Sequence, residues 1–263
     1  MKRFTFLLTA LLALASVAQA QIAAGVQRSS VNGMDVIAYR TGVKNVVFLR
    51  GSLPAGDNKS PADNPMIATL VGGMLSRGTT AHTKNEITTM LESVGASITF
   101  SVNTHKVEFN GRCLTKDVPL VISLLAEQLR QPAFTEEEFG RLKQQMLGGL
   151  KRSLENTDFR AGDEFSRAAY GPGHPNRNAT VDERIAALES AKLEDLRAFH
   201  AAHYGPAHLV LVAAGDLDVA GLQTALTKSF TGWIGGTPEL AAVQNSATDA
   251  AREQTVFMAD KTS

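Results

Sequence analysis

The stretch NPMIATLVGGMLSRGT, residues 64–79, holds the pattern on which the expected fold depends most. Asn64 followed by Pro65 is a favoured N-cap and first-turn pair, so the stretch predicts a helix that runs to about Ser76. Gly72 and Gly73 lie inside this helix, where each glycine costs about 1 kcal/mol relative to alanine. We therefore expect another interaction to offset the free-energy cost of this glycine pair.

A second helix follows, and strand-like segments flank the two helices. Thr83 and Glu86 form a capping box for the second helix, which is predicted to stop at Gly95. Four segments rich in β-branched residues are predicted strands, the first two joined by a turn at 41–42 and the last two by a turn at 104–105: 34–39, 45–53, 97–103 and 106–113. The order strand, strand, helix, helix, strand, strand predicts an α+β domain rather than a parallel sheet.

The rest of the chain is expected to be mainly helical. Apolar spacing and caps predict helices over 118–129, over 135–156 with more helix to 170, from 180, over 192–204 and over 219–230. Residues 208–214 form a continuous apolar strand. The α+β domain is thus expected over residues 21–235. Residues 236–252 are small and polar and predict a linker, and residues 253–263, with a strand at 255–258, are expected to begin a second half that continues beyond the chain.

The first residues have the features of a cleavable signal peptide. Lys2 and Arg3 precede an uncharged run to Val17, and Ala18-Gln19-Ala20 supplies a small-x-small cleavage pattern. The run is shorter than the ~20 apolar residues of a bilayer-spanning helix. We therefore expect residues 1–20 to be removed, the chain to be exported to a periplasm or secreted, and the mature chain to carry no membrane span.

Charge and cysteine content limit the class of protein. The chain has 26 basic and 26 acidic residues, and loss of Lys2 and Arg3 leaves 24 against 26, a net charge near −2. Nucleic-acid binders carry a basic stripe, whereas these basic residues are scattered among carboxylates, so we expect no nucleic-acid partner. Cys113 is the only cysteine, so no intramolecular disulfide forms and stability must come from the core.

The common motifs of enzyme chemistry are missing from the sequence. It contains no G-x-S-x-G elbow, phosphate loop, dinucleotide fingerprint or C-x-x-C pair. His200 and His203, three apart on a predicted helix with His208 nearby, are the best candidates for a metal site. No carboxylate stands at ligand spacing, so we interpret them as helix-edge histidines and place no metal there.

Three segments carry a resemblance to a known family: Met74-Leu75-Ser76-Arg77-Gly78-Thr79, then Glu86-Ile87 through Leu91-Glu92-Ser93-Val94-Gly95-Ala96, and Tyr204-Gly205-Pro206 through Gly215-Asp216. Together they resemble the insulinase or pitrilysin family of zinc metallopeptidases, in which a helix with H-x-x-E-H leads into M-L-F-x-G-T. The likeness covers roughly residues 31–235, one of the two homologous halves that usually make up such a protein. It implies the insulinase-like α+β fold, with an antiparallel or mixed sheet packed against helices.

The zinc motif of that family is degenerate in this chain. Aligned on Met74-Leu75, the positions of H-x-x-E-H read Thr69, Leu70, Val71, Gly72 and Gly73, and the family's third ligand, a glutamate, falls on Gly149. A catalytic zinc needs three protein ligands and a water, and hydrolysis needs a carboxylate that takes a proton from that water. We therefore predict no catalytic residue, metal ligand or cofactor here, with zinc expected only in an active partner.

A glycine pair stands at each degenerate position, Gly72-Gly73 and Gly148-Gly149. Neutral drift at an unused site is one explanation. The other, which we prefer as a hypothesis, is that the two helices cross closely where the metal would have been, because small residues let the backbones approach.

The leading hypothesis for function is a non-catalytic, exported insulinase-like half. By resemblance it would form part of the wall of a peptide-enclosing chamber, with a second half of its own chain or with a homologous active peptidase subunit. The alternative is a structural scaffold on the same fold with no role in proteolysis, similar to the core subunits of respiratory complexes. A third hypothesis, an active zinc peptidase, conflicts with the missing ligands.

Overall fold

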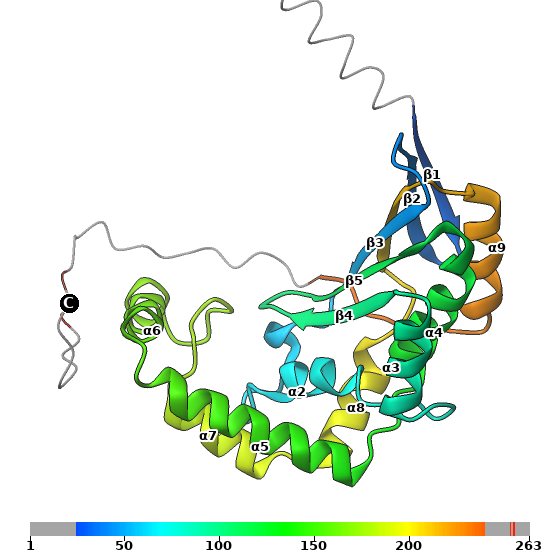
Figure 1. The fold of residues 1–263 in the computed structure, drawn as a ribbon. Coiled ribbons are helices and arrows are strands. Elements are labelled where there is room, and N and C mark those ends of the chain that lie inside the picture. Colours follow the sequence, from blue (N-terminus) through cyan, green and yellow to red (C-terminus); the bar gives the residue numbers. More distant parts are fainter. Residues whose placement is uncertain (1–24, 240–252, 254, 256–263) are drawn as a thin grey trace, which may run out of the picture.

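The computed structural model describes residues 25–239, 253 and 255 and consists of one sheet and its covering helices (Figure 1). The strands are β1 (Val26–Val31), β2 (Met34–Arg40), β3 (Val46–Leu53), β4 (Ser97–Val102), β5 (Val107–Leu114) and β6 (Val210–Gly215). The helices are α2 (Ile67–Met74), α3 (Lys84–Ser93), α4 (Val118–Arg130), α5 (Glu136–Ser153), α6 (Thr157–Ala169), α7 (Val181–Ser190), α8 (Leu193–His203) and α9 (Val219–Ser229), with 3-10 turns η1 (Asp57–Lys59) and η2 (Thr115–Asp117).

The predicted α+β class with a mixed sheet is confirmed. Within residues 25–239, no helix has the length and apolarity needed to cross a bilayer. The predicted signal peptide, the predicted linker beyond residue 239 and most of the predicted strand at 255–258 lie outside the described residues.

The sheet has the strand order β1-β2-β6-β3-β5-β4, in which only β2 and β6 run parallel. The strands predicted at 34–39 and 45–53 are present and consecutive, but they do not pair with each other, because β6 lies between β2 and β3. The segment between β2 and β3 is hydrogen-bonded to the end of β6: the N–H of Thr41 donates to the carbonyl of Gly215 (2.8 Å), and the N–H of Asn45 donates to the carboxylate of Asp216 (3.0 Å).

The apolar pattern does not predict β1. Its sequence VQRSSV is mostly polar, as is common for an edge strand with little to bury. Asn32 and Gly33, at φ 50° and 85°, make the tight turn that pairs β1 with β2. The strand is therefore set by its turn and its neighbour rather than by its own hydrophobicity.

The helices cover one face of the sheet. Alternate residues such as Val36, Leu49, Phe109 and Leu211 are buried on that face. Helix α4 packs there, and α9 packs on α4, on the same side of the sheet in Figure 1. The predicted apolar stripe of α4 is confirmed as buried: Val118, Val121, Ile122, Leu125 and Leu129. The opposite face, on which the intervening strand residues are half-buried or exposed, is called the open face.

Helix starts follow the predicted caps with one exception. The capping boxes of Thr83 with Glu86 and of Thr180 with Glu183 are both present. The helix predicted from Asn64 begins instead at Ile67. Asn64 makes a turn before it, since its Oδ1 accepts from the N–H of Met66 (3.1 Å) while its Nδ2 donates to the carbonyl of Ala187 (2.9 Å).

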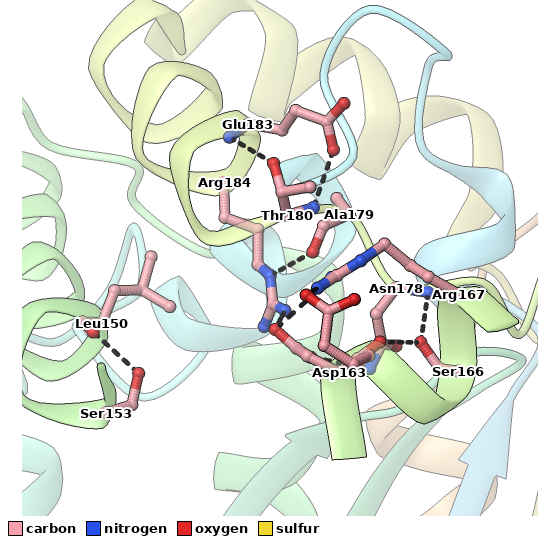
Figure 2. Close-up of polar contacts among 11 residues, drawn as sticks. Leu150, Ser153, Asp163, Ser166, Arg167, Asn178, Ala179, Thr180, Glu183 and Arg184 are labelled. Carbon is pink, nitrogen blue, oxygen red and sulfur yellow. Dashed lines mark hydrogen bonds and ion pairs between the residues drawn. The ribbon is translucent and has the colours of Figure 1, made fainter. Parts of the chain in front are cut away.

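A buried carboxylate ties α6 to α7. Asp163 on α6 is 5% exposed, forms ion pairs with Arg184 and, at 3.9 Å, with Arg167, and accepts a hydrogen bond from Asn178 (2.9 Å). Ser166 accepts from the N–H of Asn178 at 3.1 Å. Figure 2 shows these side chains converging on Asp163. The buried residues of α6 are the polar Asp163 and Ser166, so this network joins α6 to α7 through polar contacts.

Candidate functional site

The three degenerate motif positions on α2 lie beside β4, α5 and η1. Thr69 donates its hydroxyl hydrogen to Oδ1 of Asp57 in η1, at 2.7 Å. Burial raises the pKa of the Asp57 carboxyl above its ordinary value, although the hydrogen bond from Thr69 acts in the opposite direction. The hydroxyl of Thr69 is the one side-chain oxygen at the three degenerate positions on α2, and it is already hydrogen-bonded to the carboxylate of Asp57.

Apolar side chains fill the space beside Gly72 and Gly73. A Cβ added to Gly72 would lie 2.2 Å from Cγ2 of Val102, at the end of β4. A Cβ added to Gly73 would lie 3.0 Å from Cδ2 of Leu142, a buried residue of α5. Larger side chains at either position would have to displace these neighbours.

The preferred explanation of the two glycine pairs, a close approach of the two helix backbones at these glycines, is wrong. At Gly73, α2 and α5 do touch, but through the side chain of Leu142 and not through their backbones. A Cβ added to Gly149 would meet nothing within 4 Å, so no close helix crossing requires a glycine there. Gly149 lies two turns further along α5 than Leu142, beyond this contact.

The donor set at these positions does not fit a catalytic zinc. Three of the four positions are glycines without side chains, and the hydroxyl of Thr69 is a weak ligand engaged with Asp57. Within residues 25–239, no group of three or more His, Cys, Asp or Glu side chains is arranged to hold a metal ion.

The candidate histidines on α8 have separate contacts. His200 is hydrogen-bonded through Nε2 to the carbonyl of Leu129 (2.8 Å), and burial lowers its pKa. His203 contacts Thr237 through Nδ1 (3.2 Å). The helix therefore uses these two histidines in packing against different neighbours, as their position beside an apolar stripe suggested.

The chain after α9 returns to the same side of the molecule as η1. Lys59 donates to the carbonyl of Pro238 (2.6 Å), and Lys106 forms an ion pair with Glu239 (2.5 Å). Gly205 allows a close crossing, because a Cβ there would lie 2.0 Å from the backbone of Gly235. The described part of the predicted linker is thus seated against the domain near its β4–β5 turn.

Sequence reasoning missed the residues that surround the degenerate positions. Asp57, Val102 and Leu142 belong to no motif and come from three different elements. Val102 and Leu142 are ordinary apolar residues of a strand end and a helix stripe, so no local signal distinguishes them. Asp57 is separated from Thr69 by 12 residues and carries no recognisable spacing.

Comparison with known families and proteins agrees with the fold. The profile described as "Insulinase (Peptidase family M16)" matches residues 45–177, and that described as "Peptidase M16 inactive domain" matches residues 190–262. An "Uncharacterized zinc protease" of Rickettsia felis is 23% identical over 203 residues, 76% of this chain and 48% of the relative. A "Non-peptidase homolog YmxG" of Helicobacter pylori is 24% identical over 172 residues, 65% of this chain and 39% of the relative. The chain spans about half the length of the first of these relatives.

Solved structures share the architecture. A peptidase M16 inactive domain from Pseudomonas fluorescens superposes with a TM-score of 0.74 at 24% identity, over 83% of this chain and 53% of that one. A protease from Helicobacter pylori superposes with a TM-score of 0.70 at 17% identity, over 84% and 53% of the two chains. At these identities the likeness establishes the fold. The predicted family is confirmed, because its profile covers half of the chain on a matching fold: the chain belongs to the insulinase family, peptidase family M16.

Proposed function

We propose that this chain is a non-catalytic, exported member of the insulinase family that works beside an active zinc peptidase. The active component is a homologous subunit or a second half of the same protein. In this role the chain contributes part of the wall of a peptide-enclosing chamber. It holds peptides or supports its partner, and the partner cuts.

The state of the α2 site carries this proposal. Peptide hydrolysis by zinc needs three ligands, an open fourth position and a carboxylate near the metal-bound water. Here the hydroxyl of Thr69 is bound to Asp57, and the side chains of Val102 and Leu142 fill the space beside Gly72 and Gly73. The names of the relatives differ in what they imply: one relative is called a zinc protease and another a non-peptidase homolog. The match to an inactive-domain profile supports the second.

The outer strand β4 supports a role in peptide binding. Among the described strands β4 has one neighbour, β5, so its other edge is available to an added strand. Edge strands bind extended peptides through main-chain hydrogen bonds, with alternate side chains setting preference. Because Val102 at the end of β4 touches Gly72 of α2, a peptide on this edge would pass close to the degenerate site.

The proposal also includes export of the chain and a partner for it. The charged start, apolar run and small-x-small pattern of residues 1–20 support export to a periplasm or secretion. The chain spans about half the length of the relatives that it matches, which supports a requirement for a second half.

Metal analysis and peptide cleavage test the catalytic part of the proposal. The full chain, purified from the exported fraction, should hold no stoichiometric zinc and should leave a mixture of unstructured peptides uncut. Stoichiometric zinc together with cleavage that a chelator abolishes would show that the chain is itself a peptidase.

Co-purification from the same fraction tests the partner. We expect an insulinase-family chain with an intact H-x-x-E-H motif to accompany the protein, and the complex to cleave peptides. A stable complex that contains no peptidase would support the scaffold function in its place.

A further inference from the structure

A cavity of about 640 Å³ lies between helix α8 and the segment that leads from η1 into α2. Its volume is typical of pockets that bind small ligands. Helix α8 packs on α2 (Figure 1), and the cavity follows the side of α8 on which Ala198 and Ala202 lie one turn apart and leave space above the helix. The degenerate positions Thr69, Gly72 and Gly73 do not line it, so the cavity is separate from the α2 site.

One end of the cavity carries positive charge. Lys59 donates to the carbonyl of Pro238 (2.6 Å), and His203 contacts Thr237 through Nδ1 (3.2 Å), so both side chains meet consecutive residues of one segment and lie close together. Lys59 keeps two further N–H donors, and Nε2 of His203 can also donate. Within the described residues, neither Lys59 nor His203 forms an ion pair with a carboxylate.

The electrostatics of this end favour an anion. Burial lowers the pKa of the Lys59 ammonium. Burial, and then the charge of Lys59, lower the pKa of His203. A carboxylate next to either group would act in the opposite direction. An anion that entered this end would therefore be attracted by two basic side chains and would offset the repulsion between them.

The opposite end of the cavity carries an excess of carboxylates. Asn64 donates to the carbonyl of Ala187 near the end of α7 (2.9 Å), which places the neighbouring Asp63 at the α7 side of the cavity. Two carboxylates and one ammonium line this end, and within residues 25–239 neither carboxylate forms an ion pair: Asp63, Asp195 and Lys192. This end therefore favours a cationic group.

The length between the two ends suits a short extended chain. Lys192 and His203 stand at the two ends of α8, and a rise of 1.5 Å per residue puts them about 16 Å apart. An extended peptide advances by about 3.3 Å per residue, so about five residues span this length. Between the ends, the cavity is lined by apolar side chains: Ile67, Ala198, Phe199 and Ala202.

We propose that this cavity binds a free peptide of about five residues in extended form. The C-terminal carboxylate lies at Lys59 and His203, the N-terminal amine lies at Asp63 and Asp195, and small or apolar side chains lie over the alanines of α8. The site goes beyond the proposed function, because binding here requires neither a zinc peptidase nor a second half. A peptidase partner would supply such peptides as its products.

Calorimetric titration of the purified full chain with the pentapeptide Ala-Leu-Ala-Leu-Ala tests the two ends separately. We expect saturable, one-to-one binding of the peptide with free ends. Amidation of its C-terminus should weaken binding by about tenfold or more, because the charge-assisted hydrogen bonds at Lys59 and His203 are lost. Acetylation of its N-terminus should weaken binding by roughly threefold or more. Absence of saturable binding, or equal affinity for the free and amidated peptides, would overturn the proposal.

Matched substitutions on α8 test the location. Ala202→Phe fills the cavity and should weaken binding of the free peptide by about tenfold or more. Ala201→Phe is the control, because Ala201 is the exposed neighbour on the same helix and does not line the cavity. It should leave binding unchanged. Equal affinities of the two variants would show that the peptide binds elsewhere. Ala198→Leu takes the place of Ala202→Phe if that variant does not fold.

The charged end has its own test. Lys59→Met should remove most of the difference in affinity between the free and amidated peptides, because it takes away the ammonium that the carboxylate contacts. Lys84→Met, on α3 and outside the cavity lining, is the control and should keep the full difference. A full difference in the Lys59→Met variant would overturn the assignment of the carboxylate end.

These measurements are independent of the proposed function. Peptide binding that Ala202→Phe weakens, in a chain that co-purifies with no H-x-x-E-H partner, would support the cavity and contradict the proposed partner. A co-purified active peptidase together with no binding of the pentapeptide by the chain would support the proposed function and overturn the cavity proposal.

Discussion

Alanine at Gly72 and at Gly149 should have opposite effects on stability, although both residues lie in helices. Replacing glycine by alanine in a helix interior gains about 1 kcal/mol of helix propensity. At Gly149 the new methyl group meets nothing within 4 Å, so this gain should appear in full. At Gly72 the methyl would lie 2.2 Å from Cγ2 of Val102, and the stiff valine side chain must move.

The size of the difference follows from packing. Inserting a methyl group into a filled space costs about 1–3 kcal/mol. Because the propensity gain is common to both variants, Gly72→Ala should be about 1–3 kcal/mol less stable than Gly149→Ala. In a domain of this length each kcal/mol corresponds to roughly 2–4 °C in Tm.

Urea unfolding of the two variants and of the Gly72→Ala, Val102→Ala double variant measures the effect. In the double variant the nearest remaining atom, Cβ of Val102, would lie at an ordinary 3.7 Å from the new methyl group. The deficit of Gly72→Ala should therefore shrink in the Val102→Ala background, with a coupling energy of about 1 kcal/mol or more. Equal stabilisation by Gly72→Ala and Gly149→Ala, with no coupling to Val102, would refute the packing of α2 against β4.

Three further outcomes are expected. Asp163→Ala should destabilise the chain by about 1–3 kcal/mol, because it leaves the half-buried guanidinium of Arg184 without its carboxylate; a change below 1 kcal/mol in thermal unfolding would contradict the role of this network. Burial raises the pKa of Asp57 in the folded chain, which therefore binds more protons than the unfolded chain and loses stability as the pH rises above 3.8. Asp57→Asn should remove this loss. Parallel profiles of stability against pH for the two proteins would contradict the prediction. Dialysis of the purified protein against a chelator should leave its Tm unchanged, because the α2 positions do not fit zinc, and a clear fall in Tm would show a structural metal.

Much of the local structure could be predicted from the residues. The caps at Thr83 and Thr180 bind groups three residues away, so a short stretch of sequence contains all the atoms involved. The apolar stripe of α4 likewise follows from helical spacing alone. The family motifs around Met74 and Tyr204 located the degenerate positions without any coordinates.

The arrangement of strands could not be predicted in the same way. Residues 34–39 and 45–53 are adjacent in sequence and look like a hairpin, yet β6 separates them. The contact that settles this, Asn45 with Asp216, joins groups 171 residues apart. Strand β1 was also not predicted, because its sequence is mostly polar and an edge strand needs little apolar surface.

The sequence by itself determined the family, the order of most elements and the loss of the zinc ligands, because these depend on residue identity and on short-range spacing. Only the tertiary structure decided what stands where those ligands would be: Asp57 on the hydroxyl of Thr69, Val102 against Gly72 and Leu142 against Gly73. The physical reason is that packing joins side chains whose separation along the chain carries no periodic signal.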